Sequence, residues 1–146
     1  MCGIIAYIGK RQAAPILLKG IQNLEYRGYD SVGMVTKSNG NMTLRKGVGK
    51  VADADRKMNF SNMKGTMGIG HTRWATHGKV TVANAHPHIS NNCLIAVVHN
   101  GIIDNYQNIR QFLKHSGYKF KSQTDTEVIP NLVQYYMSEG KDFKDA

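Results

Sequence analysis

Short runs of apolar residues divide the first half of the chain into strands separated by polar segments. Residues 3–8 and 67–74 are each typical of a strand, and the first is buried and rich in isoleucine. Residues 31–36 and 42–46 also have strand character, and an Asn-Gly dipeptide lies between them. Because Asn-Gly is the strongest short hairpin signal, we expect a β-hairpin there.

Apolar residues at helical spacing predict three longer helices and one short one. Leucine and isoleucine recur one turn apart within residues 13–24, behind a proline that suits a first helical turn. Residues 105–116 and 126–139 are the other long helices, and each stops at a glycine. Residues 124–127 are expected to supply capping side chains for the last helix. One short helix is expected within residues 51–64.

The middle of the chain predicts a long loop followed by a strand. Residues 75–92 contain glycine, proline and several asparagines, and long loops of this kind are often functional. Residues 93–99 are apolar and predict a strand that ends sharply at Asn100 and Gly101. Strands mixed with helices and a hairpin indicate an α+β fold.

Composition and charge narrow the class of protein. A chain of 146 residues with 41% hydrophobic and 20% charged residues is typical of one folded domain. It has no apolar run of the roughly 20 residues that span a bilayer, so we expect no membrane association. Cys2 and Cys93 are the only cysteines, and we expect free thiols in the reducing cytoplasm. The net charge of +9 admits an anionic partner, but scattered lysines favour a solvated surface over nucleic-acid binding.

Cys2 is the first candidate for chemistry. Removal of Met1 would place a thiol and a free α-amine on one residue. The α-amine titrates near the same pH as a thiol, so it can accept the thiol proton, and one residue supplies nucleophile and base. The alternative is a small buried cysteine that is second in the chain by chance, and position alone favours that alternative.

Five motifs change this balance. They are Cys-Gly-Ile-Ile at residues 2–5, Tyr-Arg-Gly-Tyr-Asp at 26–30, Arg-Trp-Ala-Thr-His at 73–77, His-Asn-Gly-Ile-Ile at 99–103 and Thr-Asp-Thr-Glu at 124–127. Together and in this order they closely resemble the glutaminase domain of the glutamine–fructose-6-phosphate aminotransferase family, a class II glutamine amidotransferase. The resemblance covers the whole chain. It implies the N-terminal part of a four-layer αββα N-terminal-nucleophile hydrolase sandwich, spanning residues 2–146 and incomplete at its C-terminal side.

The resemblance implies a role for each motif in hydrolysing L-glutamine through a Cys2 thioester. Asn100 and the Gly101 backbone N–H stabilise the oxyanion, Arg73 grips the α-carboxylate, and Asp125 pairs with the α-ammonium. Each residue also has a structural alternative. Asn100 and Gly101 suit a tight turn, Arg73 a surface ion pair, and Asp125 a helix cap.

The same resemblance assigns further residues to the glutamine site. Thr76 and His77 resemble glutamine-binding residues, and Trp74 resembles a mobile cover over the site, although a single tryptophan is equally suited to a core. Arg27 lies in the family's loop beside the nucleophile. No cofactor is implied. The spacing of the histidines and Cys93 matches no common zinc pattern, so we expect no metal site.

The resemblance also implies partners. The family's sugar-isomerising domain, which binds fructose 6-phosphate and receives ammonia for glucosamine-6-phosphate synthesis, has no counterpart in residues 2–146. We therefore expect the remainder of the synthase, on the same or a separate chain, as a partner, and a dimer in the complete enzyme. The alternative function is a noncatalytic fragment that binds glutamine or a partner subunit.

Overall fold

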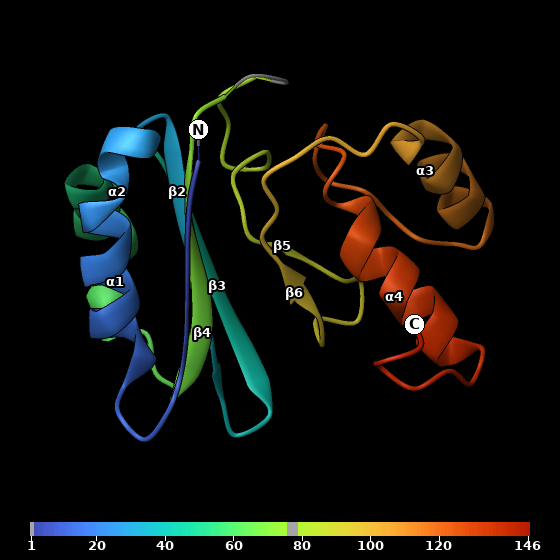
Figure 1. The fold of residues 1–146 in the computed structure, drawn as a ribbon, viewed down its shortest axis with the longest axis horizontal. Coiled ribbons are helices and arrows are strands. Elements are labelled where there is room, and N and C mark those ends of the chain that lie inside the picture. Colours follow the sequence, from blue (N-terminus) through green and yellow to red (C-terminus); the bar gives the residue numbers. More distant parts are fainter. Residues whose placement is uncertain (1, 76–78) are drawn as a thin grey trace.

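The computed structural model describes residues 2–75 and 79–146 and has four layers (Figure 1). Helices α1 and α2 form the first layer, a four-stranded sheet the second, the short strands β5 and β6 the third, and helices α3 and α4 the fourth. This is the αββα order, so the predicted fold class is confirmed. Among the described residues, no helix is both long and apolar enough to cross a membrane.

The four-stranded sheet is antiparallel throughout. Its strands are β1 (Gly3–Ile8), β4 (Met67–Arg73), β2 (Ser31–Ser38) and β3 (Asn41–Val48), in that spatial order. In the β2–β3 hairpin Asn39 has φ of 49° and Gly40 has φ of 81°, so both central residues are left-handed, as a two-residue hairpin turn requires. The predicted strands and hairpin are therefore confirmed within a few residues at their ends.

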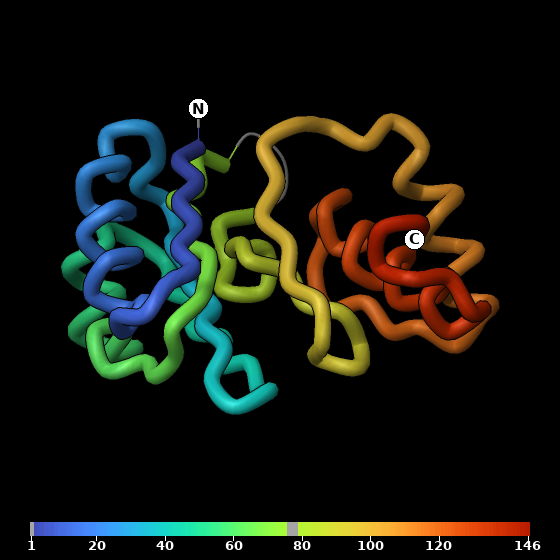
Figure 2. The backbone as a smooth tube through the Cα atoms, turned by 60° about the horizontal axis from the view of Figure 1, so that its bottom comes forward, coloured from blue at the N-terminus to red at the C-terminus, as the bar shows by residue number. Residues whose placement is uncertain are grey.

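The register of β1 on β4 positions the start of the chain. Gly3 lies opposite Thr72, and Ser31 of β2 lies opposite Arg73. Cys2 is consequently held beside the residues that follow β4. Figure 2 shows the N-terminus next to the end of β4 and to the segment after β6.

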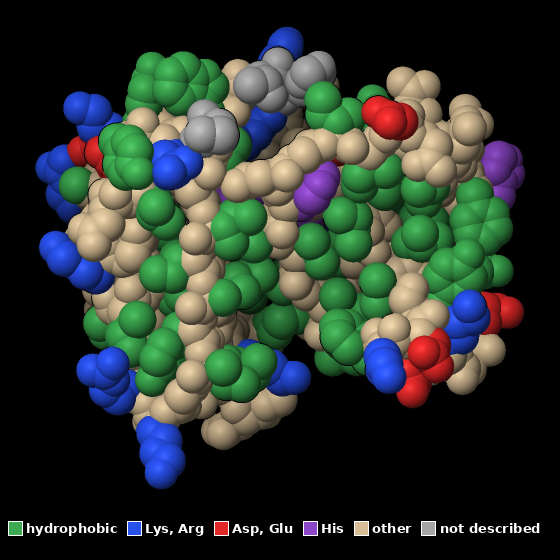
Figure 3. Space-filling model, viewed as in Figure 1, with side chains coloured by type: hydrophobic (Ala, Val, Ile, Leu, Met, Phe, Trp, Pro, Cys, Tyr) green, Lys and Arg blue, Asp and Glu red, His purple; other side chains and the backbone are tan. Residues whose placement is uncertain are grey.

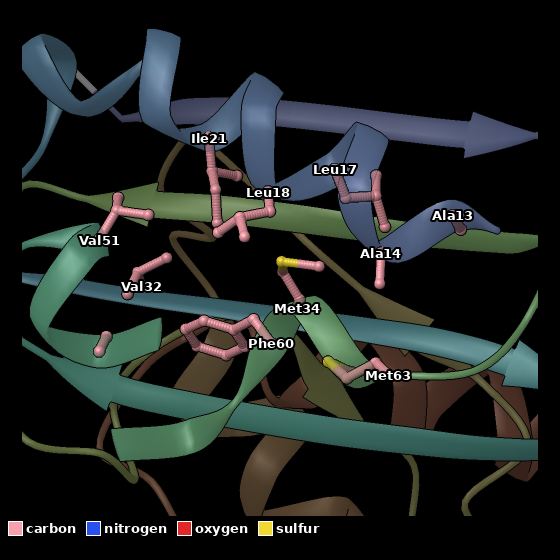
Figure 4. Packing of buried hydrophobic residues seen from close by; sticks show 11 residues of the cluster. Ala13, Ala14, Leu17, Leu18, Ile21, Val32, Met34, Val51, Phe60 and Met63 are labelled. Carbon is pink, nitrogen blue, oxygen red and sulfur yellow. The ribbon is translucent and has the colours of Figure 1, made fainter. Parts of the chain in front are cut away.

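The main apolar core lies between the four-stranded sheet and helices α1 (Ala13–Asn23) and α2 (Val51–Met58). Leu17 and Ile21 of α1 and Phe60 of the short 3-10 helix η2 (Phe60–Asn62) are fully buried there (Figure 4). The turn after α1 forms a second 3-10 helix, η1 (Glu25–Arg27). Leu17 and Ile21, which recur at helical spacing in the sequence, therefore face this core.

The second half of the chain corrects one predicted strand. Strand β6 covers only Ala96–Val97 and pairs with β5 (His88–Ile89), whereas the pattern predicts a strand over residues 93–99. The first residues of that range instead form a tight turn, in which Cys93 N–H donates to Ser90 O at 2.9 Å and Cys93 has φ of 59°. Cys93 is a free cysteine that is exposed in this turn.

The last two helices agree with the pattern. They are α3 (Tyr106–His115) and α4 (Val128–Ser138), and Pro130 lies in the first turn of α4, where its missing N–H costs no helical hydrogen bond. The predicted capping is wrong: no side chain donates or accepts a cap hydrogen bond at the start of α4. Glu127 is the N-cap residue, and its carboxylate accepts from the backbone N–H groups of Lys121 and Ser122 instead.

Lys46 and Gly33 join the sheet to the loop before β5. The Lys46 ammonium donates to Ala85 O at 2.6 Å and Ala83 O at 3.1 Å, and burial lowers the pKa of Lys46 to about 8. A side chain at Gly33 would bring its Cβ within 2.1 Å of His86 O, so only glycine admits this approach of the loop to the sheet. The loop that carries His86 is thereby held against strands β2 and β3.

Candidate active site

A cavity of about 550 Å³ opens where the N-terminus, the end of β4 and the segment after β6 meet. It is lined by all the predicted site residues that the structure describes: Cys2, Arg27, Arg73, Trp74, Asn100, Gly101 and Asp125. Predicted residues Thr76 and His77 lie outside the described residues. Segments as far apart as residues 2 and 125 therefore contribute to one cavity, although the roles of these side chains stay predictions.

Cys2 is fixed at the end of the sheet where β1 begins and β4 stops. Gly3 N–H donates to the Thr72 hydroxyl at 3.2 Å, and Trp74 N–H donates to Cys2 Sγ at 3.3 Å. The thiol is half-buried at the edge of the cavity. This arrangement holds the sulfur while leaving it within reach of a molecule in the cavity.

Asn100 lies directly against Cys2. Its side-chain Nδ2 donates to Cys2 O at 3.0 Å, and its Oδ1 is 3.0 Å from His71 Nε2. Asn100 and Gly101 follow β6 at the point where the chain turns along the mouth of the cavity. Asn100, one of the two predicted oxyanion donors, is thus placed beside the predicted nucleophile by a contact across 98 residues of sequence.

Arg73 ends β4 and is buried, with 6% of its surface exposed. One guanidinium N–H donates to Lys79 O at 3.5 Å. A surface ion pair, the alternative for Arg73, is therefore wrong. Arg27 also lines the cavity; its Nε donates to the Tyr26 hydroxyl at 3.1 Å, and its guanidinium lies over the Tyr26 ring.

Asp125 joins the segment after β6 to the segment before α4. Its Oδ2 accepts from Ile103 N–H at 2.8 Å and its Oδ1 from Thr126 N–H at 2.8 Å. Helix α4 begins three residues later, at Val128, so the capping alternative for Asp125 is wrong. A carboxylate has about four acceptor sites, and Asp125 retains capacity for a cationic group in the cavity.

Trp74 lies at the rim of the cavity. It is 44% exposed, and its ring centroid is 5.6 Å from that of Tyr29. The core alternative for this tryptophan is wrong, whereas its role as a cover stays a prediction. Asp30, to which the sequence assigned no role, supports this rim because its Oδ2 accepts from Ala75 N–H at 2.8 Å.

Three buried histidines were missed as neighbours of the site. The ring centroids of His71 and His86 are 4.4 Å apart, and those of His86 and His88 are 4.7 Å apart. Burial lowers the pKa of His71 to about 4, that of His88 to about 3, and that of His86 further still. The strand pattern contains one signal for His71, because alternate residues of a strand share a face and His71 precedes Arg73 by two.

The remaining lining residues come from the segments around these positions: His99, Ile102, Tyr106, Gln123, Thr124 and Thr126. His99 Nδ1 and the Thr126 hydroxyl are 3.3 Å apart, so they tie the two segments together. Among the residues that the structure describes, no group of three or more histidine, cysteine or acidic side chains is placed to hold a metal ion.

Comparisons with known proteins agree with this geometry. A family model described as a glutamine amidotransferase domain matches residues 43–146. The chain is 54% identical over 136 residues to a glutamine–fructose-6-phosphate aminotransferase (isomerizing) of Caldanaerobacter subterraneus subsp. tengcongensis, covering 93% of this chain and 22% of that protein. It is 51% identical over 147 residues to the protein of the same name from Methanothermobacter thermautotrophicus, covering 100% of this chain and 25% of the other.

Solved structures show the same fold. The glutamine phosphoribosylpyrophosphate amidotransferase of B. subtilis, complexed with ADP and GMP, is 29% identical with a TM-score of 0.81, covering 99% of this chain and 31% of that one. A structure described as the allosteric regulatory enzyme of purine biosynthesis is 30% identical with a TM-score of 0.84, again covering 99% and 31%. The resemblance drawn from the five motifs is confirmed. The chain spans about a quarter of the length of the aminotransferases that it matches.

Proposed function

Because the chain belongs to the glutamine amidotransferase domain family, we propose that it hydrolyses the side-chain amide of L-glutamine with Cys2 as an N-terminal nucleophile. The observation that carries this proposal is the contact of Asn100 Nδ2 with Cys2 O at 3.0 Å, on the wall of a cavity of about 550 Å³. An oxyanion donor is useful only beside the nucleophile that creates the oxyanion.

The first step needs a free α-amine on Cys2. After removal of Met1, this amine accepts the thiol proton, and the sulfur attacks the amide carbon of glutamine. The tetrahedral intermediate carries its negative charge on the former carbonyl oxygen, which Asn100 Nδ2–H and Gly101 N–H stabilise. Its collapse breaks the carbon–nitrogen bond, and the α-ammonium returns the proton as ammonia leaves.

Water completes the reaction. It attacks the thioester carbon, the amine accepts a proton from the water, and glutamate leaves as the thiol is restored. The same oxyanion donors serve this second tetrahedral intermediate, because the oxygen occupies the same position. The proposal therefore needs no cofactor and uses each of the groups around Cys2 twice.

Arg73 and Asp125 distinguish glutamine from a plain amide. The buried Arg73 guanidinium suits a bidentate contact with the α-carboxylate. Asp125, whose carboxylate is held by two backbone N–H groups, suits the α-ammonium. Trp74, Thr76 and His77 complete the proposed glutamine site, with Trp74 covering it, and Arg27 provides positive charge near the sulfur.

We propose that the ammonia released from glutamine is used by the rest of a larger enzyme. We place the chain as the glutaminase part of a synthase that makes glucosamine 6-phosphate from fructose 6-phosphate in the cytoplasm, with a dimer as the complete enzyme. The apolar cleft between the four-stranded sheet and β6, of about 440 Å³, supports a covering segment from the rest of such an enzyme. Hydrophobic side chains gather along the middle of this face (Figure 3), with Ile8, Leu94 and Phe143 more than half exposed.

Covalent labelling tests the proposed nucleophile. A diazo-ketone analogue of glutamine should alkylate Cys2, glutamine should protect against it, and Cys93→Ala should label as the wild type does, because Cys93 lies outside the cavity. Peptide mass spectrometry identifies the modified cysteine. Predominant labelling of Cys93, or labelling of the Cys2→Ala variant at the wild-type rate, would contradict the proposal.

A further inference from the structure

The proposed mechanism uses Asn100 but leaves the buried histidine beside it unexplained. His71 is fully buried in β4, with 0% of its surface exposed, and its Nε2 faces Asn100 Oδ1 at 3.0 Å. A histidine in this position costs the fold an uncompensated polar atom, because His71 Nδ1 is buried without a hydrogen-bond partner among the described residues. This loss of stability suggests that His71 is present for a function other than packing.

The hydrogen bonds determine which atom of the Asn100 amide faces which neighbour. Cys2 O is a carbonyl oxygen and can only accept, so the Asn100 atom that faces it is Nδ2. Oδ1 therefore faces His71, and since Oδ1 can only accept, His71 Nε2 carries the hydrogen. His71 is then the neutral Nε2–H tautomer, which is the form that its buried surroundings favour.

The contact with His86 is compatible with the same tautomer. Its Nδ1 lies 3.3 Å from His71 Nε2, and because Nε2 carries the hydrogen of His71, the neutral His86 ring has its lone pair on Nδ1. The single Nε2–H of His71 thus points between two acceptors, Asn100 Oδ1 and His86 Nδ1. His86 is itself held because its backbone carbonyl lies against Gly33 of the sheet.

A rotated Asn100 amide would be penalised at both ends. Turning it by half a revolution would place Nδ2–H against His71 Nε2–H and Oδ1 against Cys2 O, so two hydrogen bonds would become two repulsive contacts. In the observed orientation, one Nδ2 hydrogen is bound to Cys2 O, and the second has no partner among the described residues. That second N–H is the donor available to the oxyanion.

We infer that His71, against which the His86 ring packs, is a positioning residue that holds the Asn100 amide with its free N–H directed at the oxyanion. The inference rests on the proposed glutaminase function. His71 touches no reacting atom and acts through Asn100 alone. It is therefore expected to affect the rate of the chemical step and to leave glutamine binding by Arg73 and Asp125 unchanged.

Two substitutions separate positioning from packing. His71→Leu removes the donor, whereas His71→Gln places a side-chain amide N–H near the position of imidazole Nε2. His71→Leu should lower kcat, or the maximal rate of Cys2 alkylation by the diazo-ketone, about 100-fold, which is the scale for loss of one oxyanion donor. The KM, or the half-saturating concentration of the analogue, should stay within a factor of about three. His71→Gln should recover at least about tenfold of the lost rate.

The exposed His115 on α3 offers the matched control. His115→Gln should match the wild type in both kinetic constants, because this histidine lies outside the cavity. Equal losses in His71→Leu and His71→Gln, or a rise in KM in proportion to the fall in kcat, would overturn the inference and assign His71 to packing. Melting transitions of all variants show whether each is folded before its kinetics are compared.

Nitrogen NMR of the unmodified chain tests the inference without activity. With nitrogen-labelled histidine at neutral pH, the His71 signals should be those of a neutral ring with hydrogen on Nε2. Signals of the Nδ1–H tautomer or of an imidazolium would overturn the inference, even if His71→Leu fails to fold. Failure of the proposed function gives a different result: the wild-type chain would not be labelled at Cys2, while the His71 tautomer could still be as inferred.

Discussion

The half of the molecule built on the four-stranded sheet and the half built on β5, β6, α3 and α4 differ in what their interiors contain. Between the sheet and helices α1 and α2, the buried side chains are apolar, with Leu17, Ile21 and Phe60 among them. In the other half, much of the buried surface is polar and includes His88, Glu127 and side chains hydrogen-bonded to them. The proposed active site lies where the two halves meet.

The polar interior is one connected network. His88 Nε2 and the Thr124 hydroxyl are 2.8 Å apart, the Thr124 and Ser122 hydroxyls are 2.9 Å apart, and the Ser122 hydroxyl donates to Glu127 at 2.6 Å. Arg110 completes it by donating to Ser122 O and Thr124 O. Apolar packing tolerates small changes of shape, but a buried polar network is stable only while each member keeps its partners. The difference predicts different sensitivities for the two halves.

The largest expected effect is on the apolar half. Phe60→Ala should lower the free energy of unfolding by about 3–5 kcal/mol, because it removes a fully buried aromatic ring and leaves a cavity. Urea denaturation measures this. Phe143→Ala is the matched control, because Phe143 is 67% exposed and should lose far less. Comparable losses in the two variants would show that the core between sheet and helices is not the main source of stability.

A smaller loss is expected from the polar half. Glu127→Gln should lower the free energy of unfolding by about 2 kcal/mol, since an amide cannot accept every hydrogen bond that Glu127 takes from Lys121 and Ser122. The exposed Glu139 provides the control, and Glu139→Gln should be neutral within about 0.5 kcal/mol. A neutral Glu127→Gln would mean that the network is not needed for stability.

Acid should first affect the boundary between the two halves, where His71 of β4 and His88 of β5 are buried. The pKa of His71 is lowered to about 4 and that of His88 to about 3, against an unfolded value near 6.5. The unfolded chain therefore binds more protons below pH 6.5, and the stability present above that pH is lost as the pH falls toward 4. The expected slope is about 1 kcal/mol per pH unit for each histidine.

Denaturation at several pH values between 7.5 and 4.5 measures this slope. His88→Gln should reduce it, because one of the buried groups that must stay neutral is gone. His115→Gln should leave it unchanged, since His115 is exposed. A slope that is the same in all three proteins would contradict the assignment of acid sensitivity to the buried histidines.

The smallest effect concerns the connection between the halves. Lys46→Met removes an ammonium that donates to Ala83 O and Ala85 O, but it also removes the cost of burying that charge, which lowers the pKa of Lys46 to about 8. The two contributions oppose each other, so we expect a loss below about 1 kcal/mol. Urea denaturation at neutral pH measures this loss, with Lys144→Met as the control because Lys144 is exposed. A loss of about 3 kcal/mol would show that the halves depend on this contact.

The same contrast explains what the sequence could predict. Strand β1, the β2–β3 hairpin and helix α1 follow from local periodicity and turn residues, so their predicted bounds agree with the structure within a few residues. The site residues Cys2, Arg73, Asn100 and Asp125 could be selected because five motifs match a known family. The structure places them around one cavity, while their chemical roles rest on the proposal.

The errors fall in the polar half and share a cause. The predicted strand over residues 93–99 shrank to two residues because a turn at Cys93 uses its first part, and Glu127 binds Lys121 and Ser122 instead of a helical N–H. The part played by His71 depends on Asn100, which is 29 residues away in sequence. Contacts of this kind have no local period, so hydrophobic pattern and spacing do not reveal them.

The central claim is that Cys2 acts with its own α-amine, and the intact mass of a preparation that turns over glutamine tests it most directly. Glutamate release and intact mass are measured on the same sample, with Cys2→Ala as the inactive control. The account predicts a chain that lacks Met1 and begins at Cys2, and glutamate release that Cys2→Ala abolishes. Full turnover by a chain that retains Met1 would contradict it, because an acylated nitrogen cannot accept the thiol proton.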